Sequence, residues 1–333
     1  CIRDRFGASP AVCASFLRGR GDAGLQPFDE QGRSMHLPYG TALRMGDLGY
    51  NSSAQKGLNI CYNSLDNYVE TLRCAILRPH PDYKDIPCGQ NGDYQQLSDS
   101  LLQIENEFYS PIRPKRITRS GETPLTALSQ RGIEYIEVRC VDVNPFSAVG
   151  IDAEQMRFLD TFLLHCLLDD SPACNEQEQA NQAANLEAVV YRGRKPGLML
   201  QTDSGEQPMA ECAAKLFSAM QPVAELLDKA NASSQYTQSL QQQRAKVTDP
   251  ELTPSARVLR EMKEKDLPFF RLAMTYSEQW ADHFRSRHLS PEIQAQYEEE
   301  SRRSLEAQCE VEEADNMSFK DYLEKYFAQY RAL

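Results

Sequence analysis

Gln103-Ile-Glu-Asn-Glu-Phe-Tyr-Ser-Pro-Ile-Arg-Pro-Lys-Arg116 and, shortly after it, Arg131-Gly-Ile-Glu-Tyr-Ile-Glu-Val-Arg139 are the stretches that decide the fold. Both show the alternation of side chains that is typical of a β-strand with two different faces. One face of the second stretch carries Ile136, Val138 and Cys140. The opposite face carries Tyr135, Glu137 and Arg139. The pattern predicts two strands of an antiparallel sheet, each with a charged face.

The first stretch is expected to repeat this arrangement. Its charged face carries Glu105, Glu107 and Tyr109, and its apolar face carries Ile104 and Phe108. A basic turn fixed by Pro111 and Pro114 follows, and it contains Arg113, Lys115 and Arg116.

Glu137 and Arg139 are expected to be same-face neighbours about 7 Å apart along the strand. A carboxylate binds a hard cation and a guanidinium binds phosphoryl oxygens, so this pair suits a metal–phosphate site. The alternative is that the charges mark only the solvated face of a sheet. Two acid-faced strands beside a rigid basic turn favour the metal–phosphate site.

Composition limits the classes of protein that need to be considered. The chain has 333 residues, of which 41% are hydrophobic and 25% charged, so it is long enough for a sizeable core. A net charge of −12 argues against nucleic acids and anionic membranes as partners. No run of apolar residues is long enough for a membrane span. The ten scattered cysteines predict reduced, mostly buried thiols in a cytoplasmic protein.

Local signals predict most of the helices. Helical patterns with capping residues or apolar stripes cover Ser64–Leu77, Asp152–Leu167, Asn185–Arg192, Thr253–Met262, Pro291–Glu313 and Ser318–Tyr330, and the chain is expected to be almost wholly helical from Met209 onward. In the second of these helices, the predicted buried stripe contains Phe158, Leu159, Phe162, Leu163, Cys166 and Leu167. Loops or turns are expected at Gly7–Leu43, Pro79–Asp93 and Thr118–Thr123, and a flexible link at Asp169–Ala184. The class is α+β, with strands in the first half and helices behind them.

Other motifs do not carry a function. Gly19-Arg-Gly-Asp-Ala-Gly24 matches a dinucleotide-binding pattern, but no helix is predicted after it. No P-loop sequence is present, and the histidines lack the spacing of metal ligands. His165 is expected to be a core residue beside an apolar helix face.

A series of motifs resembles the proteobacterial type of glutamate–cysteine ligase. The matching stretches are Phe6–Ala11, Leu37–Tyr39, Leu43–Arg44, Asp47–Tyr50, Leu102–Arg116, Thr118–Glu122, Gly132–Arg139, Asn144–Ser147, Arg157–Asp160, Gly193–Leu198 and Ser255–Arg257. They occur in the family's order, and the resemblance covers only the later part of the family's sequence. It implies that an N-terminal portion with most of the acidic metal ligands is missing and that residues 1–5 are a non-matching start.

The resemblance also implies a fold. It predicts an incomplete glutamine-synthetase-like catalytic domain over residues 6–327, with a tail at 328–333. Within that domain, residues 6–150 are expected to form a strand-rich active-site part and residues 151–327 a mostly helical part.

The activity implied by the resemblance is the ATP-dependent ligation of L-glutamate to L-cysteine, the first step of glutathione biosynthesis, with Mg²⁺ or Mn²⁺ as cofactor. By resemblance, Glu137 is a metal ligand and Arg139 is the catalytic arginine that steadies the phosphoryl group. The family's contacts to the acceptor amino acid fall at Arg44, Tyr50 and Tyr109. Further phosphate contacts are proposed for Arg113, Lys115, Arg116 and Arg119, for which a structural ion-pair network is an equal alternative.

Two other functions stay open. The chain alone is expected to be inactive, so a non-catalytic domain is the first alternative. The second is a related carboxylate–amine ligase with another amino-acid acceptor. The expected partners are glutamate, cysteine and ATP, with no nucleic acid and no membrane, and the expected state is a cytoplasmic monomer.

Overall fold

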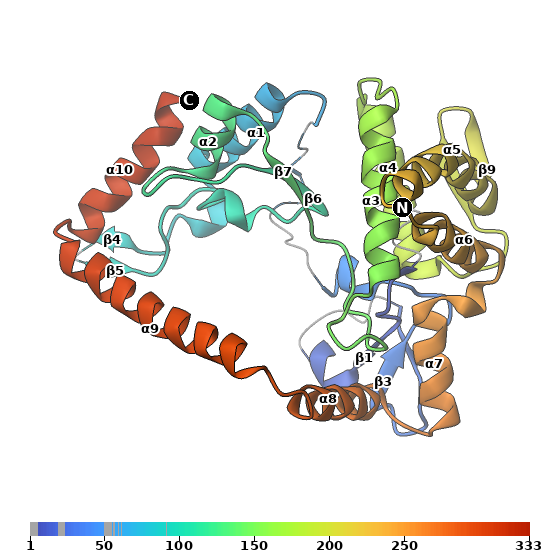
Figure 1. The fold of residues 1–333 in the computed structure, drawn as a ribbon. Coiled ribbons are helices and arrows are strands. Elements are labelled where there is room, and N and C mark those ends of the chain that lie inside the picture. Colours follow the sequence, from blue (N-terminus) through green and yellow to red (C-terminus); the bar gives the residue numbers. More distant parts are fainter. Residues whose placement is uncertain are drawn as a thin grey trace. The chain divides into compact units, whose positions relative to one another are not determined.

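The computed structural model describes residues 6–18, 24–49, 55, 57, 58, 60, 62–90 and 92–333 (Figure 1). They group into two compact units that interleave along the chain. Unit 1 takes residues 1–51 and 140–280, and unit 2 takes residues 52–139 and 281–333. The division at residue 150 was predicted between a strand-rich part and a mostly helical part of the chain. It stays a prediction.

Unit 1 begins with a small antiparallel sheet of order β1-β3-β2. Its strands are β1 (Ala11–Cys13), β2 (Gln26–Pro27) and β3 (Ser34–His36), accompanied by the short helices η2 (Ala14–Leu17) and η3 (Leu43–Met45). In the central strand, His36 is paired with Ala11 on one side and Gln26 on the other. The expectation of a loop-rich segment over Gly7–Leu43 therefore missed this sheet, because strands this short show no alternation in the sequence.

The rest of unit 1 is mainly helical. Its elements are α3 (Ala153–Leu168), α4 (Glu176–Arg192), the hairpin β8 (Met199–Thr202) and β9 (Gly205–Pro208), α5 (Met209–Ala230), α6 (Gln235–Thr248), η7 (Pro250–Leu252), α7 (Pro254–Glu264) and α8 (Phe269–Arg285), which belongs to this unit as far as Trp280. In this helical part, α3 packs against α5 and α6, and α4 packs against β8. The predicted caps of α3 and α7 are confirmed: Asp152 and Gln155 form a capping box, and the Thr253 hydroxyl accepts from Ala256.

Two expectations for this helical part were wrong. The predicted stripe of α3 is only partly buried: Phe158 packs against Phe217 with ring centroids 5.9 Å apart, but Leu167 is 79% exposed. The predicted flexible link over Asp169–Ala184 contains the start of α4, which Asn175 and Glu178 cap reciprocally. His165 is buried, as predicted, with its Nε2 atom 3.8 Å from the Asp169 carboxylate.

Unit 2 is built from helices and two-stranded ribbons, and α1, α2 and α10 pack around its core. Its elements are α1 (Leu65–Leu77), η5 (Pro81–Tyr83), β4 (Cys88–Gln90), β5 (Asp93–Tyr94), η6 (Glu105–Glu107), β6 (Ile112–Lys115), α2 (Pro124–Arg131), β7 (Tyr135–Val138), α9 (Pro291–Ala314) and α10 (Phe319–Ala332). In the core, α1 and α2 contribute Leu72, Ile76 and Leu125. From α10, Leu323, Phe327 and Tyr330 are buried there, which agrees with the amphipathic helix predicted over Ser318–Tyr330.

The strand expected over Gln103–Tyr109 was wrong. Glu105–Glu107 form the helical turn η6, and Glu105 is only 6% exposed. Its carboxylate accepts the Leu125 N–H at 2.9 Å, so the side chain faces inward to the start of α2. The expected loop over Pro79–Asp93 also contains the strand β4. By contrast, α9 has no buried residue and is the polar helix that the sequence predicts.

No helix among the described residues combines the length and the apolar character needed to span a membrane. The described cysteines are all thiols, but Cys140 is the one buried residue among them, so the expectation of mostly buried thiols was wrong.

Candidate functional site

The charged ribbon of unit 2 consists of β6 and β7 paired antiparallel (Figure 1). Arg113 lies opposite Glu137, and Lys115 lies opposite Tyr135. Directly opposed residues share a face, so these four side chains lie on one face of the ribbon. The strand predicted within Arg131–Arg139 is confirmed for Tyr135–Val138, but the start of that stretch was wrong, because Arg131 is the last residue of α2.

Glu137 has an unusual environment on this face. Its Oε2 atom is buried and accepts no hydrogen bond from the described residues. The nearest cation is the Lys115 ammonium, with Nζ 3.6 Å from Oε2. A buried carboxylate oxygen without a donor costs about 1–3 kcal/mol or more, so it is a group from which a bound cation or a donor would recover free energy.

Arg113 is turned inward and is 4% exposed. Its Nη2 atom donates to the carbonyls of Asn106, at 3.0 Å, and Phe108. These bonds secure the segment between η6 and Tyr109. The geometry favours the structural alternative for Arg113 over direct phosphate contact.

The other basic residues lie nearer solvent. Arg116 faces Glu134, with Nε 3.6 Å from Oε2. Arg119 is exposed in the turn before α2, and its backbone N–H donates to Glu122 at 2.8 Å. The Arg131 side chain holds the same carboxylate and lowers the pKa of Glu122 to about 2. The turn that presents Arg119 is therefore anchored by an ion pair at its base.

Tyr109 and Arg139 flank the ribbon. Tyr109 is 42% exposed, and its backbone N–H donates to the Gln55 side chain at 3.0 Å. Arg139 follows β7, and its N–H donates to the Pro111 carbonyl at 2.8 Å. The strand ends at Val138, one residue before Arg139. The strand pairing therefore does not test the prediction that Glu137 and Arg139 lie on the same face.

Unit 1 contains a cavity of about 600 Å³ beside Arg44, here called the Arg44 cavity. Its walls come from residues 8–9, the loop at 142–150, and helices α7 and α8. The α8 wall is apolar and aromatic, with Phe269, Leu272, Tyr276 and Trp280. A mostly apolar pocket with few polar groups is the usual form of a small-molecule site. Tyr50, also predicted at the acceptor, lies outside the described residues.

Asp142 stands at the polar end of this cavity, and the sequence analysis missed it. Its Oδ2 atom accepts the Ala8 N–H at 2.9 Å and the Ser9 hydroxyl at 2.7 Å. Its Oδ1 atom lies 3.7 Å from the Arg44 Nη1 atom. The available signal was its position between the motifs Gly132–Arg139 and Asn144–Ser147.

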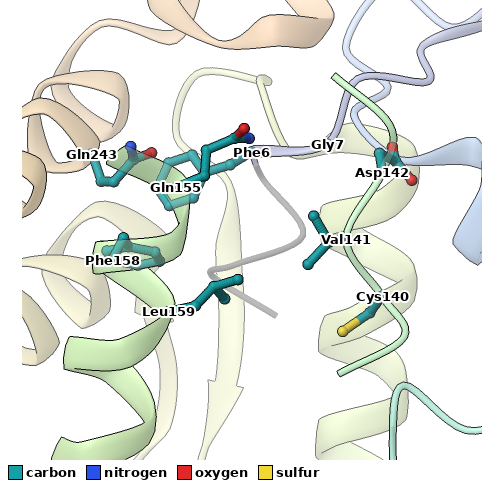
Figure 2. Close-up of a pocket in the computed structure, with 9 residues that line it drawn as sticks. All are labelled: Phe6, Gly7, Cys140, Val141, Asp142, Gln155, Phe158, Leu159 and Gln243. Atoms are coloured by element: carbon teal, nitrogen blue, oxygen red, sulfur yellow. The ribbon is translucent and has the colours of Figure 1, made fainter. Parts of the chain in front are cut away.

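A second cavity of about 40 Å³ adjoins Asp142 (Figure 2). In the figure, Phe158 and Leu159 lie on α3 across from Val141 and Asp142. Asp142 thus borders both of these cavities. The smaller cavity has room for water but not for an amino acid.

Glycines explain how the chain comes so close around Asp142 and Arg44. A Cβ atom on Gly7 would lie 2.7 Å from the Thr41 carbonyl oxygen and 2.9 Å from the Asp142 Oδ2 atom. A Cβ atom on Gly49 would lie 1.9 Å from the Arg44 carbonyl oxygen. The Phe-Gly-Ala-Ser-Pro motif therefore includes glycine because backbone segments meet there.

No group of three or more histidine, cysteine, aspartate or glutamate side chains suited to a metal occurs in the described part of the chain. A metal bound at Glu137 therefore needs oxygen ligands from elsewhere. For Mg²⁺ this is ordinary, because it commonly binds one or two carboxylates, water and the phosphates of a nucleotide.

Comparison with known proteins agrees with this architecture. The profile of the glutamate–cysteine ligase family matches residues 3–189. Glutamate–cysteine ligases of Saccharophagus degradans and Pseudomonas fluorescens are each 46% identical over 98% of this chain. The chain spans 62% and 61% of their lengths.

Solved structures give the same result. A 2.0 Å crystal structure of glutamate–cysteine ligase from Francisella tularensis, in complex with AMP, matches with a TM-score of 0.89 and 32% identity, over 99% of this chain and 67% of that one. A bifunctional glutathione synthetase from Pasteurella multocida, at 20% identity and a TM-score of 0.58, shares the fold. The chain thus has the fold of a solved glutamate–cysteine ligase. More particularly, the chain belongs to the glutamate–cysteine ligase family.

Proposed function

We propose that this chain forms part of an ATP-dependent ligase that joins the γ-carboxylate of L-glutamate to the amine of L-cysteine. The family membership supports the reaction, since the relatives carry that name. The observation that carries the proposal is the buried Glu137 oxygen without a hydrogen-bond donor, beside Lys115 on the charged ribbon.

The reaction has two steps. The γ-carboxylate of glutamate attacks the γ-phosphorus of ATP, forming an acyl phosphate and releasing ADP. The cysteine amine then attacks the acyl carbon, the new C–N bond forms, and phosphate leaves with the bonding electrons while the amine loses a proton. Both steps concentrate negative charge on phosphoryl oxygens, which cations must stabilise.

In this proposal Glu137 is one ligand of Mg²⁺ or Mn²⁺ bound with ATP. The metal, when bound, neutralises charge on the phosphates. Lys115 is close enough to Glu137 to bind a phosphate oxygen of the same nucleotide. Arg139 steadies the transferred group, and Arg116 and Arg119 are further phosphate contacts. Arg113 is assigned to holding the ribbon's neighbouring segment.

For the acceptor, we propose that Arg44 binds the carboxylate of cysteine. Its side chain is 40% exposed and borders the Arg44 cavity. An arginine fork matches a carboxylate in shape and charge. Tyr50 and Tyr109 are proposed as further acceptor contacts, from the resemblance alone.

The proposal includes the finer features of the family. These are a glutamine-synthetase-like catalytic domain over residues 6–327, with parts at 6–150 and 151–327, in a cytoplasmic monomer. The alternatives are a chain that binds ligands without turnover and a ligase with another amino-acid acceptor.

The test is ADP release that depends on both glutamate and cysteine in the presence of Mg²⁺. It is run on this chain and on a version extended to the full length of the relatives. Turnover by the extended version alone supports the ligase and makes this chain an inactive part of it. Absence of turnover by both, despite stabilisation by Mg·ATP in a thermal melt, refutes the assignment, because a ligand that binds the native state raises its melting temperature. Replacing cysteine with other small amino acids tests the second alternative.

A further inference from the structure

Asp142 connects three segments of unit 1 that lie far apart in the sequence. Its Oδ2 atom holds Ala8 and Ser9, and its Oδ1 atom faces Arg44. The Ser9 hydroxyl in turn accepts the Arg44 N–H at 3.3 Å. The carboxylate therefore sits at the junction of the Phe6–Pro10 segment, η3 and the loop after Cys140.

The two oxygens of Asp142 are used differently. Oδ2 accepts two hydrogen bonds, whereas Oδ1 is buried and accepts none from the described residues. The distance of 3.7 Å from Oδ1 to Nη1 exceeds a hydrogen bond but is within the range of an ion pair. A side chain needed only to fasten the backbone would gain nothing from directing a buried, charged oxygen at Arg44.

The geometry around Arg44 suits recognition of a carboxylate. The Asp142 carboxylate, which is 4% exposed, attracts the guanidinium, and the Arg44 side chain is 40% exposed and lines the cavity. Asp142 accepts no hydrogen bond from Arg44, and the Arg44 Nη1 atom donates to the Met45 Sδ atom at 3.5 Å, so both neighbours help to orient the guanidinium. A ligand carboxylate can then meet an arginine whose rotamer is already fixed.

We propose that Asp142 is the positioning residue that aims Arg44 at the carboxylate of the acceptor amino acid. This inference rests on the proposed function, because it takes the Arg44 cavity as the acceptor site. It adds that the preference for an amine that carries a carboxylate, over one that lacks it, depends on the negative charge of Asp142. Asp142 lines the same cavity, and in this proposal it acts through Arg44.

The variant Asp142→Asn separates charge from shape. The amide can still accept from Ala8 and Ser9 through its oxygen, and it occupies the same volume. The amide nitrogen then takes the place of Oδ1 opposite Arg44, so the negative charge that faces Arg44 is removed. Asp203→Asn is the matched control, because this aspartate is exposed in the turn between β8 and β9.

Binding is read from Trp280, the single tryptophan of the chain, which lines the Arg44 cavity. The full chain is titrated with L-cysteine and with cysteamine, which keeps the thiol and amine but lacks the carboxylate. Loss of one charged contact weakens binding about tenfold or more, so cysteine should bind the parent chain at least that much more tightly than cysteamine. In Asp142→Asn the cysteine Kd should rise about tenfold while the cysteamine Kd stays unchanged. Asp203→Asn should match the parent for both ligands.

Three results would overturn the inference: equal binding of cysteine and cysteamine by the parent chain, an equal loss of both in Asp142→Asn, or an unchanged cysteine Kd in that variant. An equal loss would assign Asp142 to the backbone alone. Failure of the ligase assignment shows differently, as missing ADP release in the extended version while the charge-dependent preference for cysteine persists.

Discussion

Substituting Tyr330 with phenylalanine tests how the core of unit 2 holds the segment in front of the charged ribbon. Tyr330 is fully buried on α10, and its hydroxyl donates to the Glu105 Oε2 atom. The Oε1 atom of the same carboxylate accepts the Leu125 N–H at 2.9 Å. One buried carboxylate thus links the C-terminal helix, the start of α2 and η6.

The magnitude follows from what the substitution leaves behind. Phenylalanine keeps the ring in its packing, so little apolar contact is lost. Glu105 is only 6% exposed, and its carboxylate loses a charge-assisted hydrogen bond. Such bonds contribute about 1.5–3 kcal/mol, and an unpaired buried charge costs more, so a loss of about 2–3 kcal/mol is expected.

The measurement is native-state hydrogen exchange of the backbone amides in α2 and α10. The Leu125 amide is the most direct reporter, because Glu105 accepts its proton. Tyr322→Phe is the matched control: it removes the same hydroxyl from the same helix at a position that is 44% exposed. A local opening free energy that falls equally in both variants, or by less than about 0.5 kcal/mol in Tyr330→Phe, would refute the reasoning, since surface changes have effects of that size.

Tyr330 also predicts a pH dependence of stability. Burial and the adjoining Glu105 charge raise the pKa of Tyr330 above its usual range. The bound proton therefore stabilises the fold fully below the unfolded pKa of about 10, and this stabilisation decreases progressively above it. Urea titrations should show Tyr330→Phe losing about 1 kcal/mol less stability than the parent between pH 10 and 11, and an identical loss contradicts this. Gly7→Ala should lower the free energy of unfolding by about 1–3 kcal/mol, because the new Cβ atom would press on the Thr41 carbonyl. Gly57→Ala, whose Cβ atom would meet no atom within 4 Å, should be tolerated. Equal melting temperatures of the two variants would refute this. In the extended version, Glu137→Gln should lower turnover about 10²–10³-fold and raise the Mg²⁺ requirement, and kinetics like the parent's would remove Glu137 from the site. Arg44→Ala should raise the KM for cysteine more than that for ATP, and the reverse order would overturn its role.

Elements marked by local signals could be predicted from the sequence. The caps at Ser64, Asp152, Thr253 and Ser318 each accept the backbone N–H that the sequence pattern requires. Capping joins residues only three positions apart, so it is visible without knowledge of the fold. The start of α4 was marked in the same way by Asn175 and Glu178, and the polar composition after Asp169 concealed it.

Elements decided by distant partners could not be predicted. Glu105 and Glu107 alternate like residues of a solvated strand, but Glu105 is buried because Leu125 and Tyr330 supply its donors. Those partners lie 20 and 225 positions away in the sequence. In the same way, Arg113 resembles a phosphate ligand in the sequence and bonds backbone carbonyls in the structure. Alternation predicts which side chains share a face of a strand. It does not show which face is buried, or which distant residues cover it.

The buried carboxylates of the chain divide by how completely their oxygens are satisfied. Glu105 and Asp228 bond backbone N–H groups and hydroxyls, and Glu261 bonds Lys265, Arg257 and Tyr276. These acids are fully used by the fold.

Glu137 and Asp142 are the acids among the described residues that keep a buried oxygen without a hydrogen bond. Each faces a cation at 3.6 or 3.7 Å, beyond hydrogen-bond distance. Folding alone gives no reason to retain such an oxygen, since replacing it with an apolar group would remove its cost. A ligand-binding site does give a reason, because the oxygen can bind a metal in one case and orient an arginine in the other. The same criterion therefore keeps Glu137 in the candidate site and adds Asp142, whereas Glu105 does not meet it.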